Sequence, residues 1–178
     1  MAESGTPRYA DIERHHTATA YVVAGERTLL IWHRNLGMWL PPGGHCELNE
    51  DPVSAAVREA REESGLDVEV VPLHPLIECS APQVLPPPAV ILLEDIIRPD
   101  QPYHQHIDHV FFTRARGEVD FEAPVPGGPA RWLTRAELLD AGLALPNPEG
   151  TLVPVAEDVR LLGVQAIDVV SSREAVRA

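Results

Sequence analysis

The 178-residue sequence contains only two cysteines, Cys46 and Cys79, and they do not form a Cys-x-x-Cys pair. This count excludes a disulfide framework, and the spacing excludes a thiolate metal site. No apolar run approaches the roughly 18 residues of a membrane-spanning helix. The polar N-terminal residues also lack the apolar core of a signal peptide. We therefore expect two reduced thiols in a cytoplasmic protein that is not inserted in a membrane.

Basic residues are also few, because 14 Lys and Arg stand against 27 Asp and Glu, for a formal net charge of −13. A polyanion or an anionic membrane surface would be repelled by such a chain, so we expect neither as a partner. A small anionic substrate stays compatible with this charge, since bound metal ions reverse the sign locally. The hydrophobic content of 44% and the length are those of one globular domain with its own core.

Residue patterning predicts a single α+β domain over residues 1–178, without internal repeats or a linker. Residues 1–16 are expected to form a partly flexible N-terminal extension, with a short helical turn over 8–14. Alternating and β-branched runs predict strands over 17–24, 28–34, 67–73, 89–97, 107–115 and 130–133. Prolines interrupt residues 72–88, and residues 117–129 form an acidic loop. Helices are expected over 53–66, 134–141 and 155–170.

The predicted helix over residues 53–66 carries the strongest local signals. Asp51 suits the N-cap, Pro52 the first helical position and Gly65 the C-terminal stop. Helical spacing gathers an apolar stripe from Val53, Ala56, Val57 and Ala60. It places three carboxylates on a separate arc, those of Glu59, Glu62 and Glu63. Because like charges on one arc repel unless cations lie among them, this helix predicts a divalent-metal site.

Residues 44–66 fill a longer spaced pattern without a departure. Its fixed positions are Gly44, Glu50, Arg58, Glu59, Glu62, Glu63 and Gly65, with Ala60 and Leu66 at the aliphatic positions. The pattern resembles the Nudix box of the Nudix hydrolases. This resemblance implies an α/β/α sandwich around a mixed β-sheet. It also implies hydrolysis of a diphosphate linkage in a nucleoside diphosphate derivative or a nucleoside triphosphate, with Mg²⁺ or Mn²⁺ as cofactor.

The resemblance also implies roles for individual residues of the box. Glu59, Glu62 and Glu63 are the expected metal-binding carboxylates, and the carbonyl of Gly44 is a possible further ligand. Glu50 and Arg58 are the expected pair that ties the loop to the helix, and both count with the three glutamates as catalytic candidates. The implied reaction is attack of a metal-activated water on phosphorus. A carboxylate must accept the proton, and the candidates are the box glutamates, Glu118 and Glu122.

The candidates for substrate binding lie outside the box. His104, His106 and Asp108 would share one face of a strand, where they form a wall of the substrate site, a supplementary metal site or an ordinary polar sheet edge. Arg34 enters the loop before the box, where it either makes bidentate contact with phosphate or is an ordinary surface cation at the end of a strand. Glu122 lies in the acidic loop. Pro82 stands near a position at which ADP-ribose enzymes of this family often carry proline, but the surrounding prolines make that match uninformative, so the substrate stays open.

Two other functions compete with the diphosphate hydrolase. A Nudix-fold sensor would bind a nucleotide without cleaving it, although such domains commonly lose box glutamates and this sequence keeps all of them. An RNA-end pyrophosphohydrolase is disfavoured by the charge of −13 and the lack of a basic stripe. The apolar residues of the C-terminal helix would support a homodimer, or would close the core of a single chain.

Overall fold

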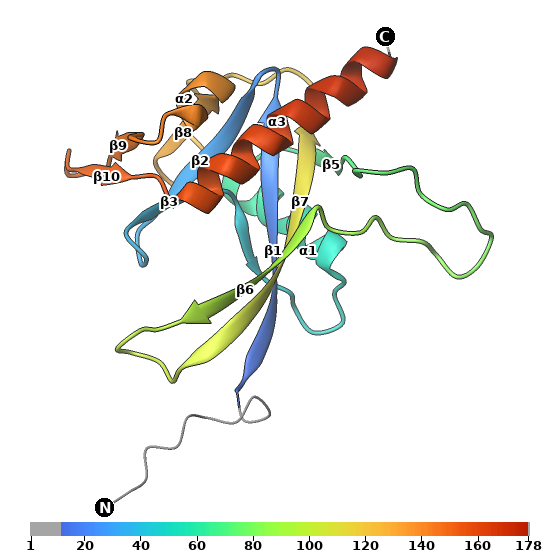
Figure 1. The fold of residues 1–178 in the computed structure, drawn as a ribbon, viewed down its shortest axis with the longest axis horizontal. Helices are drawn as coiled ribbons and strands as arrows, with labels where there is room; N and C mark the ends of the chain where they lie inside the picture. The colour runs from blue at the N-terminus through green and yellow to red at the C-terminus, as the bar shows by residue number, and fades with distance from the viewer. Residues whose placement is uncertain (1–11, 178) are drawn as a thin grey trace, which may run out of the picture.

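The computed structural model describes residues 12–177, and Figure 1 shows their arrangement around one central sheet. Eight strands form this sheet, and their bounds are β1 Arg14–Ala24, β2 Arg27–His33, β3 Met38–Leu40, β4 Gly43–His45, β5 Val68–Val70, β6 Val90–Ile96, β7 His104–Ala115 and β8 Ala130–Thr134. A separate two-stranded hairpin consists of β9 Ala144–Pro146 and β10 Leu152–Pro154. The helices are α1 Pro52–Ser64, α2 Arg135–Leu139 and α3 Glu157–Arg177.

The long strands β1 and β7 form the centre of the sheet and run parallel to each other. Their register extends from Arg14 opposite Gln105 to Val23 opposite Arg114. Antiparallel neighbours flank them, because β2 and β4 pair with β1 while β5 and β6 pair with β7. The sheet is therefore mixed, as the resemblance to the Nudix box implied.

Helices cover both faces of this sheet (Figure 1), so that the core has two halves. The first half joins α1 to the sheet, and its fully buried residues include Ala18, Ala20, Ala56, Ala60 and Phe111. The second half joins α2 and α3 to the opposite face, and its buried members include Tyr21, Phe112, Leu138, Ala166 and Val170. The predicted α/β/α sandwich is confirmed. Since α3 closes the core of its own chain, the homodimer stays a prediction.

Helix α1 begins and ends as its sequence signals indicate. Asp51 Oδ1 accepts hydrogen bonds from the backbone N–H groups of Val53 and Ser54, at 2.9 and 3.0 Å. Gly65 ends the helix with a φ of 75°, in the left-handed region that favours glycine. The buried side of the helix packs against β1, so the caps fix where the opposite, charged side lies.

We predict that Asp51→Ala lowers the free energy of unfolding by about 1 kcal/mol, the usual cost of a lost N-cap. The hydrogen bonds from Ser54 hold the pKa of Asp51 below its usual value. The stabilisation is therefore present above the ordinary Asp pKa and is lost as the pH falls through the lower pKa of the folded state. Urea unfolding at several pH values measures both effects. Glu26→Ala, in the exposed turn between β1 and β2, is the matched control, and equal unfolding curves for the two variants would refute the prediction.

Several elements differ from the predicted bounds because tertiary pairing extends or shortens them. β1 begins at Arg14, so residues 14–16 belong to the sheet and not to an N-terminal extension. Residues 8–11 of the predicted helical turn lie outside the described residues, and its last residue, Arg14, is in a strand. β7 begins at His104, three residues before the predicted strand. The β9–β10 hairpin was not predicted, since strands of three residues are too short to show a period. No helix in residues 12–177 is long and apolar enough to cross a membrane.

Candidate active site

The candidate site is built on the loop that joins β4 to α1. β4 pairs with β1, so that Gly43 lies opposite Thr19 and His45 opposite Thr17. The chain then turns through Glu47 and Glu50, where the N–H of Glu47 donates to Glu50 Oε2 at 3.1 Å. This loop therefore returns beside the charged face of α1.

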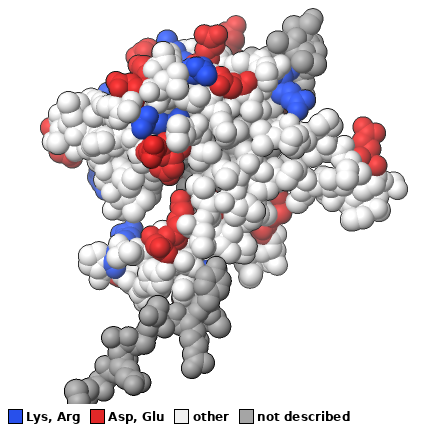
Figure 2. All heavy atoms as spheres, viewed as in Figure 1, with Lys and Arg blue, Asp and Glu red and all other residues white. Residues whose placement is uncertain are grey.

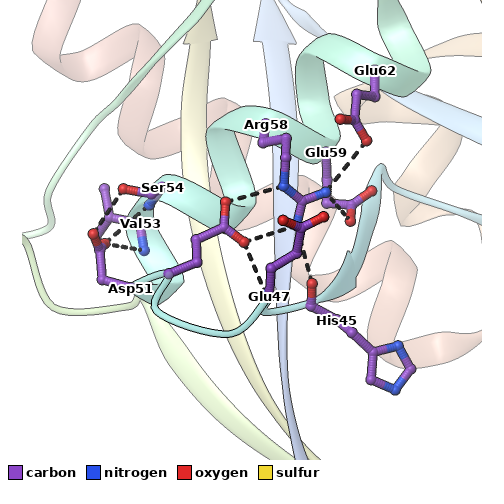
Figure 3. Close-up of polar contacts among 9 residues, drawn as sticks. His45, Glu47, Asp51, Val53, Ser54, Arg58, Glu59 and Glu62 are labelled. Carbon is purple, nitrogen blue, oxygen red and sulfur yellow. Dashed lines mark hydrogen bonds and ion pairs between the residues drawn. The ribbon is translucent and has the colours of Figure 1, made fainter.

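Arg58 joins this loop to the helix, and Figure 3 shows its guanidinium among several oxygen atoms. Its Nε and Nη2 donate to the two carboxylate oxygens of Glu50 at 3.0 and 2.9 Å. Nη2 also donates to the His45 carbonyl at 3.1 Å. Nη1 donates to Glu59 at 2.6 Å and to Glu62 at 3.3 Å. Arg58 thus contacts Glu50 as the resemblance implied, and it also neutralises part of the carboxylate arc.

The three box glutamates differ in exposure. The side chain of Glu59 is 14% exposed, whereas that of Glu62 is 59% exposed. Glu63 accepts a hydrogen bond from the N–H of Gly43 at 3.3 Å. Burial raises the pKa of Glu63, and the charges of Glu59 and Glu62 raise it further, despite the opposing effect of the Gly43 hydrogen bond. The cluster therefore holds more negative charge than Arg58 alone compensates.

These residues fit a hard divalent cation. Carboxylate and carbonyl oxygens are the ligands that Mg²⁺ and Mn²⁺ prefer. Gly44 allows the Glu59 carboxylate to lie directly against the loop backbone, because a Cβ added at position 44 would be only 2.4 Å from Glu59 Oε1. A side chain at position 44 would thus fill the space between the two elements that carry the oxygen donors.

We predict that Gly44→Ala reduces turnover by about 100-fold, because the added methyl displaces the Glu59 carboxylate and misplacement by about 1 Å has an effect of that order. The fold should survive, since the atom that must move is the end of a flexible side chain. Gly142→Ala is the matched control, as its new Cβ would meet nothing closer than 3.4 Å. Steady-state kinetics and thermal melting measure the two results. Full activity in Gly44→Ala would show that close contact between the Glu59 carboxylate and the backbone at position 44 is not required.

A cavity of about 220 Å³ opens beside the loop, between the sheet and α3. Its apolar lining includes Tyr21, Leu92, Val110 and Leu162. Its polar lining includes Gly43, Gly44, His45, Glu94, His106, Asp108 and Asp158. Figure 2 shows acidic side chains on both sides of a hollow between the first turn of α3 and β6. The cavity therefore touches the box loop at one side and combines an apolar wall with carboxylates.

Burial changes the pKa of two carboxylates of this cavity, Asp108 and Glu94. Asp108 is 4% exposed and accepts a hydrogen bond from Thr17 Oγ1 at 2.9 Å. Burial raises its pKa, although hydrogen bonds from Thr19 and Thr17 act in the opposite direction. Burial also raises the pKa of Glu94, to about 7, with a further contribution from the charge of Asp108. A cation or a hydrogen-bond donor in the cavity would therefore be bound favourably.

Comparison with known proteins identifies the family. A family model described as NUDIX domain matches residues 13–154. The chain belongs to the Nudix hydrolase family. The crystal structure of a NUDIX-family hydrolase from Clostridium perfringens superposes with a TM-score of 0.67 at 28% identity, covering 89% of this chain and 99% of that chain. The family predicted from residues 44–66 is therefore confirmed by the fold.

Matches to curated proteins are shorter. A MutT-like protein of Streptomyces ambofaciens is 43% identical over 58 residues, which is 32% of this chain and 38% of that protein. The m7GpppN-mRNA hydrolase NUDT17 of Xenopus laevis is 50% identical over 34 residues, which is 19% of this chain and 12% of that protein. This Nudix chain therefore matches less than half of the length of either relative.

The substrate-binding candidates lie in three places around the Nudix box. His106 and Asp108 line the cavity of about 220 Å³, and His104 is buried at the start of β7. Arg34 lines a neighbouring cavity of about 300 Å³ together with Glu63, so the structure brings this arginine near the box. Glu122 lines another depression, with Arg27, Phe121 and Arg131, which includes none of the box glutamates.

Three residues near this site were not among the sequence candidates. Glu94 and Asp158 reach the cavity from β6 and α3, which are distant from the box in sequence. His15 lies beside His104 and His106, because it is opposite His106 in the β1–β7 register. The period-2 alternation of the strand at 17–24, continued backward to His15, was the one local signal that pointed to this residue.

Proposed function

We propose that this Nudix hydrolase cleaves a diphosphate linkage in a nucleoside diphosphate derivative or a nucleoside triphosphate, with Mg²⁺ or Mn²⁺ as cofactor. The observation that carries this proposal is the contact of the box loop with the charged face of α1. One guanidinium, that of Arg58, joins Glu50, Glu59 and Glu62, and Glu63 bonds to the loop beside them. All the box carboxylates therefore lie beside the same loop, next to cavities large enough for parts of a small substrate.

Glu59, Glu62 and Glu63 would hold the cation, with the Gly44 carbonyl as a further oxygen donor. When bound, such a cation neutralises charge on the diphosphate and lowers the pKa of the attacking water. The role of Arg58 is to position these groups, because its planar guanidinium donates hydrogen bonds to both the loop and the helix and so fixes their relative position. In this structure the same guanidinium occupies oxygens of Glu59 and Glu62, so cation binding and these two contacts compete.

The proton released by the attacking water must pass to a carboxylate. Glu122 is exposed and lines a depression without any box glutamate. Glu63, by contrast, is held by the Gly43 N–H and lines the same cavity as Arg34. We therefore assign the acceptor to the box glutamates and not to the acidic loop, and we assign the contact with substrate phosphate to Arg34.

The part of the substrate beyond the diphosphate would occupy the cavity of about 220 Å³. Tyr21, Leu92 and Val110 supply an apolar wall for a ring, whereas Asp108 and Glu94 supply acceptors for its donor groups. Such a lining, apolar with a few polar groups, is typical of sites for small organic ligands. It favours a substrate with a neutral, donor-bearing group next to its phosphates.

The deciding experiment is a panel of nucleoside triphosphates, ADP-ribose, nucleotide sugars and dinucleoside polyphosphates, with phosphate and pyrophosphate release as the readout. We expect cleavage of at least one compound with Mg²⁺ or Mn²⁺, and none after chelation by EDTA. Tight binding of a nucleotide without cleavage of any compound would establish the sensor instead. Cleavage that persists in EDTA would overturn the assignment of the metal.

A further inference from the structure

Three histidines converge on the paired strands β1 and β7, beside His45 of the box loop. His15 on β1 lies opposite His106 on β7, and His104 lies two residues earlier on the same face of β7. One ring nitrogen from each lies within 4.8 Å of the other two. The ring centroids of His15 and His104 are 4.8 Å apart, and those of His104 and His106 are 5.1 Å apart. The three rings therefore share one small volume.

Hydrogen bonds engage one nitrogen of His15 and one of His104, and two buried nitrogens of the cluster have no partner within the described part of the chain. His15 Nε2 lies 3.0 Å from a carboxylate oxygen of Glu13, and His104 Nδ1 lies 2.9 Å from the carbonyl oxygen of Pro102. His15 Nδ1 and His106 Nε2 are buried and have no hydrogen-bond partner among residues 12–177. A buried polar atom without a partner is costly, so these two nitrogens indicate a group that binds both.

We propose that His15, His104 and His106 bind one divalent transition-metal ion of the Zn²⁺ class, at a site distinct from the box carboxylates. Imidazole nitrogen suits Zn²⁺, Cu²⁺ and Ni²⁺, whereas Mg²⁺ prefers oxygen. Tetrahedral ligands at roughly 2.0–2.1 Å from Zn²⁺ are about 3.3 Å apart. The three nitrogens now lie within 4.8 Å of one another. Side-chain movements of about 1–1.5 Å would bring them to the spacing of metal ligands.

The surroundings of the three rings are those of metal-binding histidines. A ligating histidine usually donates its second N–H to a carboxylate or to a backbone carbonyl, which fixes the ring. Glu13 takes this role for His15, and the Pro102 carbonyl takes it for His104.

Asp108 shares the strand face of His104 and His106 but does not complete this set. Its carboxylate accepts the hydrogen bond from Thr17 on the neighbouring strand. We therefore take His15 as the third ligand, because its ring nitrogen lies close to those of His104 and His106. Asp108 stays a candidate for substrate binding.

An ion at this site would place positive charge beside the substrate cavity. His106 lines that cavity, as does His45, whose ring centroid is 4.8 Å from that of His106. Three protein ligands also leave a fourth position of a tetrahedral ion for water or an anionic group. The proposed site therefore has three protein ligands, as catalytic zinc sites do, and it lies at the wall of the substrate cavity.

The test is isothermal titration of the full, chelator-stripped chain with ZnCl₂ under excess Mg²⁺, which occupies the box carboxylates. We expect one Zn²⁺ per chain, and an affinity at least 100-fold weaker in His15→Gln and His104→Gln. Glu13→Gln should weaken binding by about 10–100-fold, the usual effect of a lost outer partner. His74→Gln, at an exposed histidine of the loop after β5, should match the parent.

Glu63→Gln should also bind Zn²⁺ like the parent, so that failure of the proposed hydrolysis and failure of this proposal are distinguishable. Replacing Zn²⁺ by Co²⁺ adds a visible absorption band that reports imidazole ligation directly. Circular dichroism of each variant separates lost ligation from lost fold; if the buried His104→Gln unfolds, His15→Gln and Glu13→Gln decide. A parent that takes up no Zn²⁺, or folded variants that take it up undiminished, would overturn the proposal.

Discussion

Glu63→Gln should reduce turnover by about 10²–10⁴-fold, the range found when a group that takes part in proton transfer is lost. The amide keeps the size of the carboxylate but removes the charge that would bind a cation or accept a proton. The hydrogen bond from the Gly43 N–H can pass to the amide oxygen, so the loop should stay in place. Hydrolysis of the best substrate of the panel, followed at saturating Mg²⁺, measures the loss.

Glu26→Gln, which removes one exposed carboxylate from the turn after β1, provides the control for charge and should keep the parent rate. Thermal melting should show Glu63→Gln to be as stable as the parent or more so, because burial raises the pKa of Glu63 in the folded state. Unchanged turnover in Glu63→Gln at several Mg²⁺ concentrations would remove this residue from the active site.

Arg58→Lys should reduce turnover by about 100-fold and lower the free energy of unfolding by about 2 kcal/mol. The guanidinium makes five hydrogen bonds in a fixed fork, two of them to Glu50. A lysine ammonium is a point charge with three donors, so it cannot hold Glu50, Glu59 and the His45 carbonyl together. Kinetics and urea unfolding of the same preparation measure the two losses.

Arg61→Lys is the matched control on the same helix, because Arg61 is 73% exposed and its carboxylate partner Asp67 is 3.5 Å away. Exposed ion pairs contribute about 0–1 kcal/mol, so this variant should behave like the parent. If Arg58→Lys also behaves like the parent, positive charge alone is sufficient at position 58, and the fork has no positioning role.

The sequence predicted best what local signals determine. Helix α1 was placed within two residues at each end, because Asp51, Pro52 and Gly65 act through bonds to their own neighbours. The long apolar runs of β2 and β6 were also located, and the box residues identified the family. The hairpin β9–β10 and the true start of β1 depend on pairing with other segments, so a local pattern does not contain them.

The residues that line the cavity could likewise not all be predicted from local sequence patterns. Asp158 lies on α3 and Glu94 on β6, and nothing near either residue in the sequence relates it to the box. His104, His106 and Asp108 were correctly placed on one strand face, since strand alternation is local. The register between β1 and β7 determines which of these side chains face the cavity. It also determines that Asp108 accepts a hydrogen bond from Thr17.

That register also has a consequence for folding kinetics. Thr17 and Asp108, which face each other across the parallel pair, are 91 positions apart in the chain. Such long-range pairs must close a large loop before their contacts compensate for the lost chain entropy, and they slow folding. The β1–β2 hairpin and α1 have no such requirement, so the cavity and the histidine site are assembled only when the central strands meet. A metal that needs both strands binds the native chain alone and stabilises it accordingly.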